Sequence, residues 1–407
     1  MNKISNQETI KNIKEEKLPI IIFGTGVVGE ALSYACRNAG IKVECFCDNN
    51  INKAGSSLCG LEIIHTTNLK IKYKDAIFLI SAADIKDVVE QLKSLGYSKW
   101  YDSTLLLRDF DIYQYQFSAP LDFVEYAVSS CLLCHDSYLI PDKLFLRSVD
   151  IIITEHCSLK CRDCSNLTQY YKNPKNCDIN ELIKSIDIFC DIVDEVNEFR
   201  VIGAEPFMNP DFNFVVKRLI DEPKVRKIVI YTNGTIIPQE EKLECLKNDK
   251  VLLIITDYGP LSRNLNALTQ KLSQHNIAFY VQKPYGWTDC AKIGRHFRNI
   301  EAQKEIFNNC CAKNLVTISD GKLYRCPFAA NASRLKAIPN YKNDYVDFFQ
   351  ELQKGADVSE MKKKIRKYLL EKDFLETCDF CNGRSFGDPE ITPAIQTNKP
   401  LEYEEYN

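Results

Sequence analysis

Residues 151–164 have the sequence Ile-Ile-Ile-Thr-Glu-His-Cys-Ser-Leu-Lys-Cys-Arg-Asp-Cys. The apolar run at its start predicts a short buried strand, and the polar residues after it predict a loop. Cys157, Cys161 and Cys164 stand on that loop with the spacing Cys-x3-Cys-x2-Cys. Three thiolates brought together in this way can ligate three irons of a [4Fe–4S] cluster and leave the fourth iron open to an exogenous ligand. The alternatives are a zinc site, completed by a ligand such as His156, and chance clustering in a cysteine-rich chain.

The strand before this loop is the first of a regular series. Apolar runs predict strands at 151–154, 199–203, 227–232, 251–256 and 278–282, and helical patterns lie between them near 179–194, 211–221, 239–248 and 264–275. Repeated βα units of this kind build either a barrel or an open parallel sheet. In both, functional residues are expected at the C-terminal ends of the strands.

Three further motifs lie at the ends of predicted strands. Gly203-Ala204-Glu205-Pro206 ends the second strand, Thr232-Asn233-Gly234 ends the third, and Asp257 follows the fourth. Together with the cysteine triplet, their order resembles the radical S-adenosylmethionine (radical SAM) superfamily.

This resemblance implies a partial (β/α)6 barrel whose cysteine triplet holds a [4Fe–4S] cluster and binds S-adenosylmethionine. In the family, the motif at Gly203, Glu205 and Pro206 holds the methionyl amine, Thr232 and Asn233 belong to a common turn, and Asp257 falls where polar groups contact the ribose. The reduced cluster delivers one electron to the sulfonium, and the resulting 5′-deoxyadenosyl radical abstracts hydrogen from an unactivated C–H bond. The chain departs from the family pattern in two places: Asp163 stands where an aromatic residue usually touches adenine, and Ala204 replaces a second glycine.

A second set of cysteines follows the predicted barrel. Cys311 and Cys326 flank Gly321 with the spacing Cys-x9-Gly-x4-Cys, and Cys378 and Cys381 form a Cys-x2-Cys pair. By spacing alone, four thiols suit either a closed zinc site or an iron–sulfur cluster. Behind a radical SAM core the pattern resembles a twitch domain, the abbreviated SPASM module, which implies one auxiliary [4Fe–4S] cluster. Cys310 precedes Cys311 directly, so the sequence leaves open which of the two is the ligand.

The first hundred residues carry a different signal. Gly24, Gly26 and Gly29 form a Gly-x-Gly-x-x-Gly loop between a predicted strand and helix, and Asp48 ends the next strand. Such a loop lets a phosphate approach the backbone at a helix N-terminus, although a tight turn that only packs is the alternative. The segment from Phe23 to Gly55 resembles the Rossmann-like N-terminal domains of bacterial sugar acyltransferases and related sugar-modifying enzymes, which implies a nucleotide-sugar or related phosphate ligand.

Composition limits the class of protein. The chain has 407 residues, 45% hydrophobic and 26% charged, which is ordinary for a folded globular protein and too long for one small domain. The net charge of −3 gives no strong basic field for nucleic acid or anionic lipid. With neither a signal peptide nor an apolar run long enough to span a membrane, we expect a cytoplasmic protein, in which the 18 cysteines serve as metal ligands or catalytic groups rather than as disulfides.

We therefore expect an α/β enzyme with consecutive domains. Its parts are a Rossmann-like domain at 1–105, a linker at 106–147, the radical SAM barrel at 148–299, a small α+β twitch-type domain at 300–390 and a tail at 391–407. The substrate is expected to be a small molecule, a carbohydrate or nucleotide-sugar, which would be oxidised, epimerised or rearranged with electrons from a flavodoxin or ferredoxin. The alternatives are a peptide-modifying radical SAM enzyme and a non-catalytic nucleotide-binding protein whose fold is stabilised by bound metals. No residue is singled out as the catalytic group.

Overall fold

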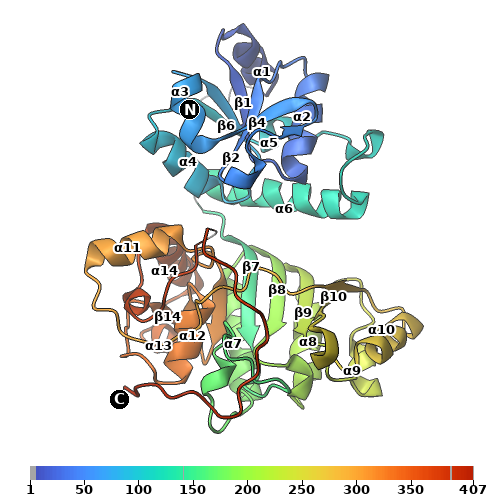
Figure 1. The fold of residues 1–407 in the computed structure, drawn as a ribbon, viewed down its shortest axis with the longest axis vertical. Coiled ribbons are helices and arrows are strands. Elements are labelled where there is room, and N and C mark those ends of the chain that lie inside the picture. The colour runs from blue at the N-terminus through green and yellow to red at the C-terminus, as the bar shows by residue number, and fades with distance from the viewer. Residues whose placement is uncertain (1–5, 141, 386, 407) are drawn as a thin grey trace. The chain divides into compact units, whose positions relative to one another are not determined.

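The computed structural model describes residues 6–140, 142–385 and 387–406. The chain divides into two compact units, Met1–Phe145 and Leu146–Asn407, and Figure 1 traces both in the order of the sequence. Each unit is built around its own sheet, and both sheets are rich in parallel strand pairs. The α/β class expected from the sequence is therefore confirmed.

The first unit contains a six-stranded sheet in the order β3-β4-β2-β1-β5-β6. All neighbouring pairs are parallel except β3 with β4. Chain order reverses between β1 and β5, so this is a doubly wound arrangement with its switch point at the C-terminal end of β1. The elements of this unit are α1 (Asn6–Glu15), β1 (Ile20–Phe23), α2 (Val27–Asn38), β2 (Cys45–Asp48), β3 (Ser57–Leu58), β4 (Leu61–His65), α3 (Leu69–Lys72), β5 (Ile77–Ile80), α4 (Ile85–Ser94), β6 (Trp100–Asp102), α5 (Thr104–Leu107) and α6 (Leu121–Leu139).

The segment 106–147, expected as a linker, is mostly part of this first unit. It contains α6, whose Val124 and Val128 are buried in the same apolar cluster as Ile20 and Ile22 of β1. His135, also on α6, is buried; its Nδ1 accepts from the backbone N–H of Ser103 and its Nε2 lies 2.8 Å from the carbonyl oxygen of Ala82. Helix α6 is hard to recognise in the sequence because its own apolar residues are distributed almost evenly around the helix axis, which leaves a weak helical periodicity.

The second unit contains an eight-stranded sheet in the order β11-β10-β9-β8-β7-β12-β13-β14. The five strands of the predicted series lie side by side in chain order, with helices between them close to the predicted ranges. These elements are β7 (Phe145–Ile152), α7 (Ile179–Ile192), β8 (Glu195–Ile202), α8 (Phe212–Ile220), β9 (Val225–Thr232), α9 (Glu240–Cys245), β10 (Val251–Thr256), α10 (Leu265–Gln274) and β11 (Phe279–Gln282).

The last part of the chain extends this same sheet. Strand β12 pairs parallel with β7, and β13 and β14 follow as antiparallel neighbours. The hairpin between β12 and β13 turns at Asp320 and Gly321, both with positive φ. The C-terminal elements are α11 (Ile300–Asn309), β12 (Val316–Ser319), β13 (Lys322–Tyr324), α12 (Pro327–Arg334), β14 (Tyr345–Asp347), α13 (Phe348–Gln353) and α14 (Val358–Glu371).

The C-terminal part is therefore joined to the barrel strands rather than forming a sheet of its own. Ile152 of β7 and Ile202 of β8 share a buried cluster with Phe307, Leu375 and Cys378 from the C-terminal part. The pairing satisfies the backbone groups of β7, which would otherwise form an open edge of the sheet. The ends of β7 and β8 consequently lie against the second group of cysteines.

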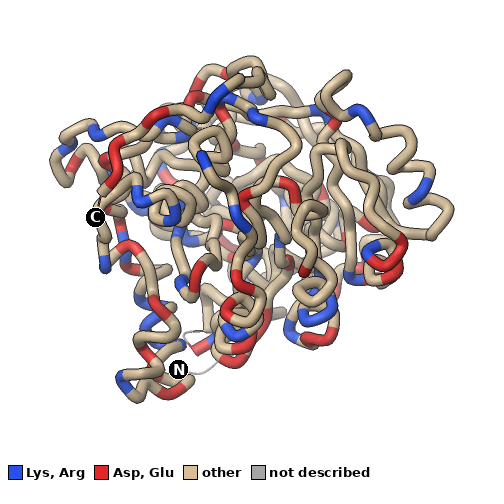
Figure 2. The backbone as a smooth tube through the Cα atoms, turned by 90° about the horizontal axis from the view of Figure 1, so that it is seen from below, with Lys and Arg blue, Asp and Glu red and all other residues tan. Residues whose placement is uncertain are grey.

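Charged residues are interspersed along the chain, as the tube in Figure 2 shows. This distribution accords with the small net charge of −3. Among the helices of the described residues, none combines the length and apolar character that crossing a membrane requires.

Candidate active site at the strand ends

The cysteine triplet lies on the loop that follows β7. Leu159 and Cys161 are buried in an apolar cluster against which Cys157 and Cys164 also pack. Burial raises the pKa of the Cys161 thiol to about 12 and also raises the pKa of Cys157. Buried thiols of this kind are neutral and poor nucleophiles at pH 7, and a bound cation would convert them to thiolates. The loop is therefore suited to hold a metal centre rather than to supply a free nucleophile.

The spacing of the sulfurs separates the two kinds of metal site. Within the described ranges, the only group of three or more His, Cys, Asp or Glu whose ligand atoms lie within 4.8 Å of one another contains no cysteine. A tetrahedral zinc would bring its sulfurs to about 3.8 Å from one another. In a [4Fe–4S] cluster each thiolate binds a different iron, so the sulfurs lie farther apart. In this structure the three sulfurs are therefore not all as close to one another as a tetrahedral zinc would require, whereas the wider spacing of a [4Fe–4S] cluster is compatible with them.

The turn after β8 packs directly against the start of the cysteine loop. The backbone N–H groups of Ala204 and Glu205 donate to the carbonyl oxygens of Thr154 and His156, at 3.0 and 2.9 Å. Gly203 has a φ of +130°, and a Cβ placed on it would lie 2.3 Å from the carbonyl oxygen of Thr154. Glycine is required here because any side chain would force the two strand ends apart.

Glu205 is fully buried and connects the ends of β8 and β9. Its carboxylate accepts from the Thr232 hydroxyl at 2.9 Å, from the backbone N–H of Asn233 at 3.0 Å and from the backbone N–H of Phe207 at 3.4 Å. Burial raises the pKa of Glu205 to about 7, and these hydrogen bonds oppose the rise. Pro206 begins a short 3₁₀ turn over Pro206–Met208. In this structure, Glu205 thus holds the loops in place.

Asn233 joins the turn after β9 to the cysteine loop. Its side-chain amide lies 3.6 Å from the sulfur of Cys157 and 3.2 Å from the Ser158 hydroxyl. Its side-chain oxygen accepts from the backbone N–H of Thr235 at 3.0 Å. The predicted motifs after the first three strands are therefore one connected hydrogen-bonded assembly.

Asp257 lies farther along the same edge, after β10. Its carboxylate forms an ion pair with the exposed Lys283 and accepts from the backbone N–H of Gly259 at 2.8 Å. The hydrogen bond from Lys283 holds the pKa of Asp257 below its ordinary value. Asp257 is anionic at neutral pH, and the structure shows no direct contact between it and the cysteines.

Two aromatic residues flank the cysteine loop. Tyr258 and Trp287 both pack against the apolar cluster of Leu159 and Cys161, with ring centroids 6.1 Å apart and planes nearly perpendicular. Neither ring stands in a sequence motif that could mark it as part of a site. These rings supply aromatic surface beside a loop in which Asp163 replaces the family's usual aromatic residue.

The C-terminal segment also covers the cysteine loop, a contact that no sequence motif predicts. Residue 396 forms an isolated bridge with Cys161, and its side-chain amide lies 3.2 Å from the sulfur of Cys161. The two residues are 235 positions apart in the sequence. Local motifs cannot reveal such a contact.

The second group of cysteines lies around a mainly apolar cavity of about 50 Å³. The lining thiols are those of Cys290, Cys310, Cys326, Cys378 and Cys381. Of the two neighbouring cysteines between which the sequence does not decide, Cys310 lines this cavity and Cys311 does not. The backbone N–H of Cys311 donates to the carbonyl oxygen of Arg384 at 2.7 Å.

The glycine loop of the first unit lies between β1 and α2, at the switch point of its sheet. A Cβ on Gly29 would lie 2.3 Å from the carbonyl oxygen of Gly24, so this glycine allows α2 to approach the strand closely. A Cβ on Gly26 would meet nothing within 4 Å. The side chain of Asp48 points back to the loop, and its carboxylate accepts from the backbone N–H of Thr25 at 3.2 Å. The Nζ of Lys53 lies 3.5 Å from the same carboxylate.

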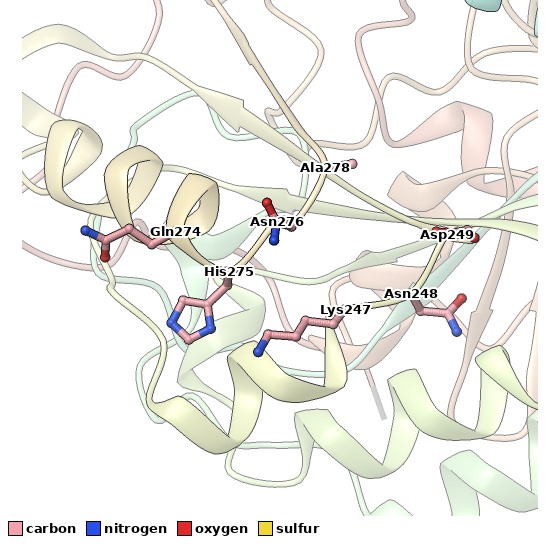
Figure 3. Close-up of a pocket in the computed structure, with 7 residues that line it drawn as sticks. All are labelled: Lys247, Asn248, Asp249, Gln274, His275, Asn276 and Ala278. Carbon is pink, nitrogen blue, oxygen red and sulfur yellow. The ribbon is translucent and has the colours of Figure 1, made fainter.

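A pocket of about 390 Å³ lies elsewhere in the second unit, between the end of α10 and the residues before β10 (Figure 3). His275 and Lys247 line it, and Asp249 and Ala278 mark the N-terminal ends of β10 and β11. The only group of candidate metal ligands noted above, Glu240, Glu244 and His275, lies here, but Lys271 and Lys247 already pair with the two carboxylates. The pocket is at the opposite ends of the strands from the cysteine loop, where parallel βα sheets do not usually place their sites.

Two family models match this chain. Residues 151–261 match the radical SAM superfamily, and residues 16–100 match a family described as C2185-like, N-terminal. The second unit of this chain therefore contains a radical SAM domain. The matched range includes the cysteine triplet and the ends of the first four strands of the series. The chain is an enzyme, and the family of its matched domain implies S-adenosylmethionine and a [4Fe–4S] cluster as cofactors.

Individual proteins resemble the chain over shorter stretches. A GTP 3′,8-cyclase from Clostridium acetobutylicum is 25% identical over 139 residues, which are 30% of this chain and 43% of that protein. A GTP 3′,8-cyclase from Stenotrophomonas maltophilia is 27% identical over 90 residues, 21% of this chain and 26% of that protein. The chain thus spans less than half the length of these curated relatives.

Similar solved structures include BtrN in complex with AdoMet and 2-DOIA and anSMEcpe with bound AdoMet and a peptide. The match to BtrN has a TM-score of 0.38 and 15% sequence identity, and it covers 59% of this chain and 94% of the BtrN chain. The match to anSMEcpe has a TM-score of 0.38 and 13% sequence identity, and it covers 58% of this chain and 83% of the anSMEcpe chain.

Proposed function

We propose that this enzyme cleaves S-adenosylmethionine reductively at a [4Fe–4S] cluster held by Cys157, Cys161 and Cys164. When bound, the cluster supplies one electron to the sulfonium, and the 5′-deoxyadenosyl radical that forms abstracts a hydrogen atom from the substrate. The observation that carries the proposal is the joining of three strand ends around the cysteine loop, through Glu205 and Asn233.

The chain's own residues would orient the cofactor and keep water away from the radical. Gly203 lets the turn after β8 lie directly against Thr154 at the start of the cysteine loop, and the buried Glu205 fixes that turn. Asp257 presents a carboxylate suited to ribose hydroxyls, while Tyr258 and Trp287 offer aromatic surface to adenine. The C-terminal segment over Cys161 covers the loop from another side.

We further propose that Cys310, Cys326, Cys378 and Cys381 hold an auxiliary [4Fe–4S] cluster of the twitch type. As in the first group, no three of these sulfurs lie within 4.8 Å of one another, a spacing that a tetrahedral zinc would require and a [4Fe–4S] cluster would not. Arg298 supports the last two ligands because its guanidinium donates to the carbonyl oxygens of Cys378 and Cys381, at 2.8 and 2.9 Å. An auxiliary cluster here could accept an electron from a substrate radical, which favours an oxidation.

The neighbouring cysteines provide a matched test of this second site. We expect Cys310→Ser to remove about four irons per chain and Cys311→Ser to remove none. Iron analysis and the electron paramagnetic resonance (EPR) spectrum of the anaerobically reconstituted variants measure this. Retention of all iron in Cys310→Ser, with loss in Cys311→Ser, would instead make Cys311 the ligand.

For the first unit, we propose that the Rossmann-like loop between β1 and α2 binds a phosphate of the substrate. The N-terminus of α2 presents backbone N–H groups at the switch point, and Lys53 lies beside Thr25 with a 2.9 Å hydrogen bond to its hydroxyl. Gly26 leaves open space at the helix start. A nucleotide-sugar, or another carbohydrate carrying a phosphate, is the substrate class that this loop suits.

The experiment is to reconstitute the enzyme anaerobically, reduce it, and measure 5′-deoxyadenosine with S-adenosylmethionine and separate candidate substrates. The panel contains nucleotide-sugars, GTP and peptides, and flavodoxin and ferredoxin are compared as electron donors. We expect a yellow-brown protein with about eight irons, and 5′-deoxyadenosine formation that nucleotide-sugars stimulate. Stimulation by peptides alone would assign the enzyme to peptide modification. A colourless protein that contains zinc and forms no 5′-deoxyadenosine would indicate a non-catalytic binding protein whose fold is stabilised by metals.

A further inference from the structure

A C-terminal strap, defined as residues 391–401, runs along the cysteine loop. The backbone N–H of Arg162 donates to the carbonyl oxygen of Ile395, and the N–H of Thr397 donates to the carbonyl oxygen of Lys160, both at 2.7 Å. Ala394 is buried and packs with Leu159 and Cys161. The red end of the chain in Figure 1 shows this strap passing across the second unit. The loop that carries the cluster ligands is thus paired with a distant strand-like segment.

The strap is fixed at both of its ends as well. The N–H of Ile391 donates to the carbonyl oxygen of Trp287 at 2.8 Å, and the N–H of Leu401 donates to that of Gln169 at 2.8 Å. Ala394 has a φ of +57°, a conformation that alanine adopts only where its surroundings impose it. These contacts indicate a docked segment with a defined position on the loop.

Gln396 lies at the centre of this pairing, and both the oxygen and the nitrogen of its side-chain amide form hydrogen bonds to the loop. Its Oε1 accepts from the backbone N–H of Lys160 at 2.7 Å, and its Nε2 donates to the sulfur of Cys161 at 3.2 Å. The same Nε2 donates to the carbonyl oxygen of Ala394 at 2.8 Å, which sets the orientation of the amide. The neighbouring Thr397 has no such role, because its buried hydroxyl has no hydrogen-bond partner.

We propose that Gln396 is a positioning residue for the cluster loop, and that its hydrogen bond to Cys161 raises the reduction potential of the cluster. The inference rests on the cluster site proposed above. A donor on a ligand sulfur favours the reduced state, because reduction adds negative charge that the N–H group stabilises. The strap also keeps water from the Cys161 side of the loop, and exposure to solvent is another determinant of the potential.

The test compares Gln396→Leu with Thr397→Val in the 407-residue chain. Gln396→Leu removes all three hydrogen bonds of the side chain, whereas Thr397→Val changes a side chain of the same strap that makes none. Two measurements are made on each: the midpoint potential of the reconstituted cluster, followed by EPR, and amide hydrogen exchange of residues 157–164 in the iron-free protein. Gln396→Glu serves as a further variant, because it keeps the acceptor for Lys160 and replaces the donor to the sulfur by a carboxylate oxygen.

We expect Gln396→Leu to make the potential more negative and to speed exchange of the Lys160 amide about tenfold, as the loss of one or two hydrogen bonds predicts. Gln396→Glu should lower the potential with a smaller effect on exchange, and Thr397→Val should match the unmodified chain in both. Unchanged potential in Gln396→Leu would overturn the electronic role, and unchanged exchange would overturn the positioning role. If the unmodified chain gave no cluster signal, the proposed function would fail instead, and the exchange measurement would still decide whether Gln396 positions the loop.

Discussion

Single residues at the strand ends decide whether the site can form, and Gly203 is the sharpest case. Its φ of +130° and the 2.3 Å approach that a Cβ would make to Thr154 leave no room for another residue. Gly294, in the same unit, is a matched control because a Cβ there would meet nothing within 4 Å.

We expect Gly203→Ala to destabilise the second unit by about 2–4 kcal/mol, through backbone strain together with the clash, and to reduce iron loading. Gly294→Ala should change the unfolding free energy by less than about 1 kcal/mol. Chemical denaturation and iron analysis of both variants measure the difference. Equal effects of the two substitutions would show that the close approach at Gly203 does not limit the site.

His135 gives the first unit a pH dependence. Burial lowers the pKa of this imidazole from 6.5, because desolvation penalises its charged form. Below pH 6.5 the unfolded chain therefore binds a proton that the folded unit does not, so stability is lost as the pH falls.

We expect the unfolding free energy of the first unit to drop below pH 6.5 with a slope of up to about 1.4 kcal/mol per pH unit from this group. Trp100 fluorescence reports this unit when Trp287 is replaced by Phe, since the chain has two tryptophans. His135→Gln should flatten the slope. If the substituted and unsubstituted proteins had the same pH profile, His135 would not be the responsible group.

The sequence identified those site residues that belong to compact motifs. Cys157, Cys161, Cys164, Glu205 and Asn233 were all predicted, and the structure brings them together, because each motif stands at the end of an apolar strand. Gln396 and Tyr258 were missed, since their contacts depend on tertiary packing rather than on spacing. The sequence does not decide between the neighbours Cys310 and Cys311, and it is the lining of the cavity that separates them.

At the scale of elements, a buried ion pair links the C-terminal part to the cysteine loop. Arg334 ends α12 and lies 2.6 Å from the carboxylate of Glu155, which directly precedes His156 on the loop. The side chains are 4% and 3% exposed, so solvent screens their interaction little. Asp320 of the hairpin turn also pairs with Arg334.

We expect Arg334→Met to destabilise the second unit by about 3–5 kcal/mol, because it leaves the Glu155 carboxylate buried without its partner. Lys367→Ala, which removes one end of the exposed pair with Glu371, should cost less than about 1 kcal/mol. Denaturation followed by Trp287 fluorescence in a Trp100→Phe background measures both. Adding Glu155→Gln to Arg334→Met should recover part of the loss, and purely additive effects would contradict the coupling.

Most helices and strands could be predicted from the sequence. The order in which the strands pair in the two sheets could be predicted only in part. The strands and helices of the second unit were clear, because apolar runs alternate with amphipathic segments. Strand β4 was missed because it follows directly on a tight turn at Cys59 and Gly60, both with positive φ. The pairing of β12 with β7 could not be predicted, since the two strands lie more than 160 residues apart and their pairing depends on the open edge of β7.

At the scale of the whole molecule, the two units have separate cores and separate chemistry. Apolar clusters of the first unit surround β1 and β5, whereas those of the second surround β7, β8 and the cysteine groups. Iron would bind only to the second unit, so its free energy of binding adds only to the stability of that unit.

We expect removal of iron by a chelator under reducing conditions to lower the unfolding free energy of the second unit by about 3 kcal/mol or more, and to leave that of the first unit unchanged. The two single-tryptophan backgrounds report the units separately. A loss of stability confined to the first unit would place the metal elsewhere in the chain.

The most direct test of the central claim replaces Cys157, Cys161 and Cys164 together by alanine in the full-length chain. The measurement is iron content and 5′-deoxyadenosine formation from S-adenosylmethionine, after anaerobic reconstitution and strong reduction. We predict that iron falls from about eight to about four per chain and that 5′-deoxyadenosine formation is abolished. A variant that still cleaved S-adenosylmethionine at the rate of the unmodified enzyme would contradict the assignment of the site to this loop.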